Sequence, residues 1–185
     1  MAEIKSHEFD RFVDCGIGTY RIFVIYGPDR GLVSERAALL AKKSGVAQDD
    51  PFSLLKLDVG DLHNDPGRLL DEVNSLGLFG GEKLVWLRGA TNEKPLLDAL
   101  AVLAAGPPPA NLLIIEAGDL KKASGLRKIV EPAKSVAVIP CYADDARALN
   151  ALIDTELAQD HLAITPEARR QLLELLGGDR VASRN

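Results

Sequence analysis

The sequence has few cysteines, no long apolar run and no leader-like N-terminus. Its two cysteines, Cys15 and Cys141, lie far apart, so they form neither a metal-ligand spacing nor a disulfide framework. Such cysteines are typical of reduced thiols in the cytosol. No apolar run approaches the roughly 20 residues that a membrane-spanning helix needs, and residues 1–12 contain no apolar signal core. These absences predict a cytoplasmic protein without a membrane span.

Residue patterns that support catalysis or metal binding are also missing. The three histidines, His7, His63 and His161, are scattered, and none has a metal-ligand spacing. The sequence contains no Gly-x-Ser-x-Gly elbow. The GLFGG run at 77–81 follows an expected helix and precedes an expected strand, which is the wrong order for a dinucleotide site. We therefore expect no intrinsic catalysis, no cofactor and no metal.

Basic residues are outnumbered by acidic ones, 22 against 27, and the formal net charge is −5. This balance argues against a surface that is covered all round with nucleic-acid-binding charge. Basic residues concentrate in one stretch, which contains Lys121, Lys122, Arg127, Lys128 and Lys134. That stretch is either a plain solvated face or a weak DNA contact.

The sequence does contain a regular alternation of strand and helix patterns. With 46% hydrophobic and 26% charged residues, the composition is that of an ordinary globular protein. Because continuous apolar runs that alternate with helices are typical of βα units, we expect a five-stranded, mostly parallel sheet flanked by helices. The expected strands are Arg21–Gly27, Phe52–Val59, Lys83–Leu87, Leu112–Glu116 and Ser135–Pro140.

Helices flank these strands and continue after the last of them. An amphipathic helix is expected near Ser6–Val13, and others follow each of the first four strands, including one at Lys122–Glu131. After Cys141 the patterns predict helices at 144–159 and 165–176 and the beginning of a third near 178. We therefore expect an α/β domain over residues 1–142 and an incomplete helical domain over residues 143–185.

The turn after the first expected strand stands where a phosphate-binding loop would be. Gly27 and Ser34 have the separation of the first glycine and the hydroxyl residue in a P-loop. However, Leu32 and Val33 occupy the places of the second glycine and the lysine, and Gly31 stands one place early. The loop therefore lacks, at its usual place, the lysine that offsets the charge of a triphosphate. We predict that this degenerate loop binds no ATP; the alternative is an active P-loop ATPase or nucleotide kinase with an atypical loop.

The strand at 112–116 ends in an acid, as the magnesium-binding strand of such NTPases does. Only Glu116 is present, followed by Ala117. A lone glutamate at this place is interpreted as a solvated or capping group. This strand therefore gives no support for a magnesium site.

The segment Ser75–Gly81 combines large apolar side chains with glycine. Leu78 and Phe79 follow an amphipathic helix and are bracketed by glycines, which withdraw cover from neighbouring side chains. The pair either projects as an exposed partner site or folds back as a cover on the sheet. The residues alone leave both alternatives open.

The five residues SLGLF resemble the bacterial clamp-binding motif, roughly Gln-Leu-Ser/Asp-Leu-Phe. Ser75 takes the place of the glutamine, Leu76 that of the first leucine, and Leu78 and Phe79 those of the closing pair. A degenerate P-loop, this motif before the third strand, DLKKASGLRK at 119–128, SVAVIPC at 135–141 and GGDRVASRN at 177–185 follow in order. Over its whole length, the chain resembles the delta subunits of bacterial DNA polymerase III.

The resemblance implies an AAA+-like α/β domain followed by a helical lid. It implies a clamp-loader subunit without ATPase activity of its own, in a holoenzyme classed as a DNA-directed DNA polymerase, a nucleotidyltransferase. Its partners would be the β sliding clamp and the tau/gamma and delta-prime subunits, with DNA contacted only indirectly or weakly. Family members carry a further C-terminal collar domain, and we expect that this domain is absent from the chain. An AAA+-like scaffold that does not touch the clamp is a further reading.

Overall fold

The computed structural model contains a parallel sheet of six strands. It describes residues 2–4, 8–15, 17–76, 81–142, 150, 153–154, 156–158 and 162–175. The strands stand in the order β1-β6-β2-β5-β4-β3, and every neighbouring pair is parallel. Their bounds are β1 Ala2–Glu3, β2 Ile22–Tyr26, β3 Leu54–Asp58, β4 Leu84–Ala90, β5 Leu112–Ala117 and β6 Val136–Pro140.

The five strands expected from the sequence are confirmed, and β1 adds a short strand at the edge of the sheet. Ala2 pairs with Ala137 and Glu3 with Val138. A strand of two residues has no periodic pattern, and for this reason the sequence did not predict it.

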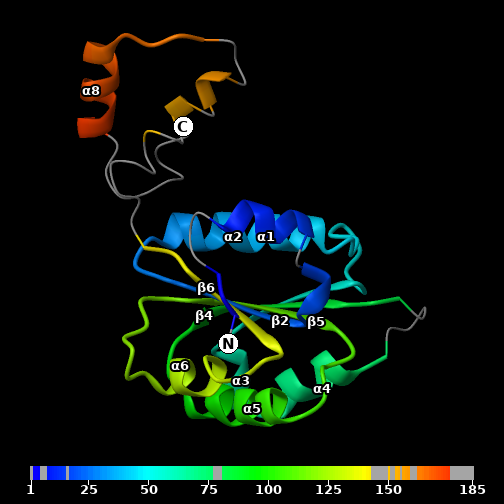
Figure 1. Cartoon of the computed structure of the whole chain (residues 1–185). Helices are drawn as coiled ribbons and strands as arrows, with labels where there is room; N and C mark the ends of the chain where they lie inside the picture. The colour runs from blue at the N-terminus through cyan, green and yellow to red at the C-terminus, as the bar shows by residue number, and fades with distance from the viewer. Residues whose placement is uncertain are drawn as a thin grey trace.

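Helices cover both faces of the sheet (Figure 1). The described helices are α1 Phe9–Cys15, the 3-10 helix η2 Ile17–Thr19, α2 Arg30–Lys43, α3 Asp61–Asn64, α4 Arg68–Asn74, α5 Lys94–Ala105, α6 Gly125–Val130 and α8 Pro166–Leu175. Helices α1 and α2 lie on one face, whereas α3 to α6 lie on the other. None of the described helices is long and apolar enough to cross a bilayer.

One predicted helix begins later than the sequence suggested. Helix α6 starts at Gly125 instead of Lys122, because the side chain of Ser124 accepts the N–H of Arg127 and caps the helix there. Helix α1 is described as Phe9–Cys15, and residues 6 and 7, at the expected beginning of this helix, lie outside the described residues.

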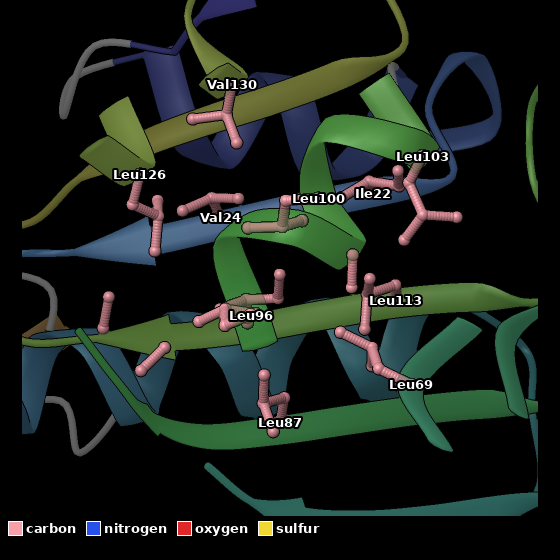
Figure 2. Close-up of a cluster of buried hydrophobic side chains, with 14 of the residues drawn as sticks. Ile22, Val24, Leu69, Leu87, Leu96, Leu100, Leu103, Leu113, Leu126 and Val130 are labelled. Carbon is pink, nitrogen blue, oxygen red and sulfur yellow. The ribbon is translucent and has the colours of Figure 1, made fainter. Parts of the chain in front are cut away.

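The core is split by the sheet into two hydrophobic layers. Successive side chains of β2 alternate between them: Ile22, Val24 and Tyr26 face α5 and α6, whereas Phe23 and Ile25 face α1 and α2. All five are buried, which explains why the run is continuously apolar instead of alternating. Figure 2 shows the first layer, where side chains of β2, β4 and β5 meet those of α4, α5 and α6.

The connections that follow the neighbouring strands β2 and β5 run over opposite faces of the sheet. Helix α2 leaves β2 over one face, whereas the helix that follows β5 lies over the other. In open α/β sheets, ligands bind at such a switch point, outside the carboxyl ends of the strands. The degenerate loop at 27–34 lies at this end, and the expected clamp-binding segment precedes the amino end of β4.

Beyond β6 the structure describes helix α8 and short pieces of chain. Helix α8 agrees with the prediction, and the hydroxyl of Thr165 accepts the N–H of Ala168 at its start. Arg169 on this helix is paired with Asp154. The third expected helix lies outside the described residues, and the domain boundary near residue 142 stays a prediction.

Candidate functional site

The turn between β2 and α2 contains three residues. Helix α2 begins at Arg30, so the turn consists of Gly27, Pro28 and Asp29. The carboxylate of Asp29 is buried and accepts the N–H of Leu32 at 2.9 Å. A helix N-terminus is the usual place for a bound phosphate. Here a side-chain carboxylate already accepts a backbone N–H at that place.

The remaining residues of the loop belong to the helix and its core contacts. Leu32 and Val33, at the positions of the second glycine and the lysine, are buried in the layer between α2 and the sheet. Gly31 is half-buried in the first turn of α2. Gly27 packs so closely against the chain after β6 that a Cβ would lie 1.7 Å from the carbonyl oxygen of Cys141. Gly27 is thus required by packing.

Ser34 and Glu116, at the positions of the hydroxyl and acidic residues, bind to one another. The Oγ of Ser34 donates to Oε2 of Glu116 at 3.0 Å, and Nε1 of Trp86 donates to Oε1 at 2.7 Å. Glu116 is half-buried and accepts a hydrogen bond on each oxygen, so protein groups bind it in addition to any contact with solvent. In the described part of the chain, no three His, Cys, Asp or Glu side chains are grouped to hold a metal ion.

Arg127, expected among the candidate DNA contacts, is withdrawn from the surface. It is 5% exposed, its guanidinium lies 5.0 Å from the ring centre of Tyr26, and it is paired with Glu131. Its Nη1 also donates to the carbonyl of Leu120. Burial raises the pKa of the Tyr26 phenol, whereas the charge of Arg127 acts to lower it. Arg127 is thus buried among core residues, which corrects its place among the candidate DNA contacts.

The other basic residues of that stretch are exposed. They are Lys121, Lys122, Lys128 and Lys134. The first two follow β5 at the carboxyl end of the sheet, and Lys128 lies on α6. A contact of Lys121, Lys122 and Lys128 with DNA stays a prediction.

At the amino end of the sheet, the chain leaves α4 through Ser75 and Leu76. Ser75 adopts an extended backbone, and its Oγ donates to the carbonyl of Glu72 at 3.0 Å. The side chain of Leu76 is 88% exposed. Leu78 and Phe79, the closing pair of the expected motif, lie outside the described residues.

The sequence did not point to Asn111, a buried residue beside this segment. Its amide donates to the carbonyls of Glu72 and Ser75 and accepts the backbone N–H of Lys83. It is 2% exposed. Because asparagine is common in loops such as GPPPAN, nothing in the pattern distinguishes this one as buried.

Sequence comparisons link the chain to one replication family. The model of the DNA polymerase III delta subunit matches residues 23–141. A curated protein of Rickettsia prowazekii, described as a probable DNA polymerase III subunit delta, is 25% identical over 166 residues. That alignment covers 88% of this chain and 47% of the relative, so the chain spans about half of its relative's length.

Solved structures share the fold at low sequence identity. The DNA clamp loader delta protein of Bacillus subtilis superposes with a TM-score of 0.68 at 18% identity, over 96% of this chain and 54% of that one. A Walker-type ATPase of Pyrococcus abyssi superposes with a TM-score of 0.53 at 14% identity, over 96% and 66%. The chain therefore has an AAA+-like α/β fold, which by itself does not decide whether nucleotide binds.

Proposed function

Because the chain belongs to the family of DNA polymerase III delta subunits, we propose that it binds and opens the β sliding clamp for processive DNA replication. The observation that carries the proposal is the family match over residues 23–141, most of the α/β domain. In the full-length protein, the tau/gamma and delta-prime subunits would be its further partners. Because the chain spans about half of its relative, these partnerships are part of the proposal.

The proposed clamp contact is the segment that begins at Ser75 and includes Leu76, Leu78 and Phe79. Its support is the similarity of SLGLF to clamp-binding motifs, together with the exposure of Leu76 at the end of α4. An exposed apolar side chain next to further large apolar residues is typical of a partner site. Burial of Leu78 and Phe79 in an apolar pocket would contribute roughly 3–6 kcal/mol before the costs of association.

Opening of the ring would follow from unequal affinity for two states of the clamp. A ligand shifts a conformational equilibrium only by the difference between its affinities for the two states. If the chain binds the distorted clamp interface more tightly than the closed one, its binding energy favours the open ring. Such a mechanism needs no chemistry within this chain.

We further propose that ATP is bound and hydrolysed by other subunits. Three contacts support this view: Asp29 caps α2, Val33 is buried at the lysine position, and Ser34 donates to Glu116. A phosphate at the start of α2 would meet the negative charge of Asp29 without a neutralising lysine. The alternative of an active P-loop ATPase requires these contacts to rearrange.

The experiment that tests the proposal is equilibrium binding of the chain to purified β clamp. We compare the parent with a Leu78→Ala, Phe79→Ala double variant and with Leu162→Ala, which removes an exposed leucine outside the α/β domain. We expect the double variant to lose about 2–4 kcal/mol of binding free energy, or about 30- to 1,000-fold in affinity. The control should bind as the parent does.

Two results would oppose the proposal. If the parent does not bind the clamp, the clamp-loader function fails and an AAA+-like scaffold of other use remains. If a folded double variant binds as tightly as the parent, the chain uses another surface, and the assignment of Leu78 and Phe79 is wrong. Circular dichroism of each variant shows whether it is folded.

A further inference from the structure

Asn111 joins two parts of the chain that are distant in sequence. It precedes β5 and is 2% exposed. Its Nδ2 donates to the carbonyls of Glu72 at 3.1 Å and Ser75 at 2.7 Å, while its Oδ1 accepts the backbone N–H of Lys83 at 3.0 Å. Its own N–H donates to the carbonyl of Val73. The buried side-chain amide of Asn111 therefore binds both the end of α4 and Lys83, the residue before β4.

The hydrogen bonds of Asn111 explain how α4 ends. The last carbonyls of a helix have no partner within the helix, and a glycine often supplies the turn that satisfies them. Here Ser75 is extended, with φ −68° and ψ 145°, and the carbonyls of Glu72 and Val73 are bound from outside the helix by Asn111. An asparagine side chain suits this position because its planar amide donates two hydrogen bonds and accepts others.

The side chain of Lys83 also contacts the end of α4. Its Nζ donates to Oγ of Ser75 at 2.9 Å and lies 3.6 Å from Oε2 of Glu72. The amino end of β4 is thereby tied to the end of α4 through both backbone and side chain. These hydrogen bonds involve Ser75 and Lys83, which flank residues 76–82 and with them the proposed clamp-binding segment.

We infer that Asn111, assisted by Lys83, is a positioning residue that holds both ends of the clamp-binding segment and so raises its affinity for the clamp. The inference rests on the proposed function. A segment whose ends are fixed has fewer conformations in the free protein, so less conformational entropy is lost on binding. Preorganisation of this kind increases affinity without adding a contact to the partner.

Two substitutions test the inference in the intact chain. Asn111→Ala removes the side-chain ties, whereas Asn92→Ala removes an asparagine that accepts the N–H of Leu126 at the opposite end of the sheet. We expect Asn111→Ala to weaken clamp binding by about 5- to 30-fold. The control should change affinity by no more than about twofold.

Amide hydrogen exchange of the free chain separates positioning from a loss of overall stability. If Asn111 positions the segment, its replacement should speed exchange in residues 75–83 and leave the interior of β5, such as Ile114, as protected as in the parent. Uniformly faster exchange through β4 and β5 would instead reveal a structural role and overturn the inference. Lys83→Met, which removes only the outer ties, should weaken binding less and provides the test if Asn111→Ala does not fold.

The outcomes also separate this inference from the function on which it rests. If the parent does not bind the clamp, both the positioning role and the proposed function are refuted. A parent that binds, with a folded Asn111→Ala variant that binds equally well, overturns the positioning role and leaves the proposed function intact. If Asn111→Ala does not fold, equal binding by Lys83→Met and the parent overturns the positioning role.

Discussion

The contact between Gly27 and Cys141 makes a single methyl group at residue 27 costly. A Cβ at residue 27 would lie 1.7 Å from the carbonyl oxygen, 2.4 Å from the carbonyl carbon and 3.0 Å from the Cα of Cys141. All three are backbone atoms, so no side-chain rotation relieves the clash. The backbone is also anchored on both sides, because Gly27 N donates to Gly118 O and Cys141 N donates to Tyr26 O at 2.6 Å. Gly27→Ala must therefore displace one of these strand ends.

The cost of Gly27→Ala can be worked from those contacts. Overpacking of a core site typically costs about 1–3 kcal/mol. Loss of one backbone hydrogen bond between the displaced strands adds about 1 kcal/mol. The free energy of unfolding should fall by roughly 2–4 kcal/mol in total. With a urea m-value of about 2 kcal/mol/M, the unfolding midpoint should fall by roughly 1–2 M.

Urea unfolding followed by circular dichroism measures this change. The matched control is Gly18→Ala, because a Cβ there meets nothing within 4 Å, and its midpoint should stay close to that of the parent. A Gly27→Ala midpoint equal to that of the parent would refute the packing argument. The expected loss also means that reduced ATP binding in a Gly27 variant would not identify a phosphate loop, whereas a Ser34 variant is informative.

Two further predictions concern Glu116 and Tyr26, which lie near the carboxyl ends of β5 and β2. The fluorescence of Trp86, the sole tryptophan, should not change with Mg-ATP, because Trp86 and Ser34 already occupy both oxygens of Glu116; a saturable change that disappears in Ser34→Ala would favour the ATPase alternative. Burial raises the pKa of the Tyr26 phenol above its usual value near 10, so the folded protein retains this proton more tightly than the unfolded chain. Stability should therefore be full below about pH 10 and fall as the pH rises further. In urea unfolding measured from pH 8 to 11, Tyr26→Phe should show a smaller fall, and an equal fall would contradict this assignment.

The strands could be predicted because their signal is local. Residues 22–26 and 136–140 are buried on both faces, so each run is continuously apolar and can be recognised without knowing its neighbours. The strand at Ala2–Glu3 could not be found in this way, because its existence depends on pairing with Ala137 and Val138. The order of the strands also required the three-dimensional structure.

At the candidate site, the sequence alone shows which residue types a P-loop would need and which of them are missing. Val33 in place of a lysine removes the cation of a P-loop whatever the fold does. By contrast, the burial of Arg127 depends on Tyr26 and Leu120, and Glu116 finds Ser34 82 positions away along the chain. Asn111 likewise binds residues 28 to 39 positions distant. Such partners come from tertiary packing, which a periodic pattern does not encode.

Strand β5 runs from the amino end of the sheet to its carboxyl end. Its contacts at the two ends indicate whether nucleotide could influence the proposed clamp binding. Asn111 at its amino end holds the segment after α4, whereas Glu116 near its carboxyl end is bound by Ser34 and Trp86. Because Ser34 and Trp86 donate to the two oxygens of Glu116, we expect the position of β5 not to change with magnesium or nucleotide. The hydrogen bonds from Asn111 to the proposed clamp-binding segment should then also not change with nucleotide. If the proposed clamp binding responds to ATP, we expect the response to reach this chain through contacts with other subunits.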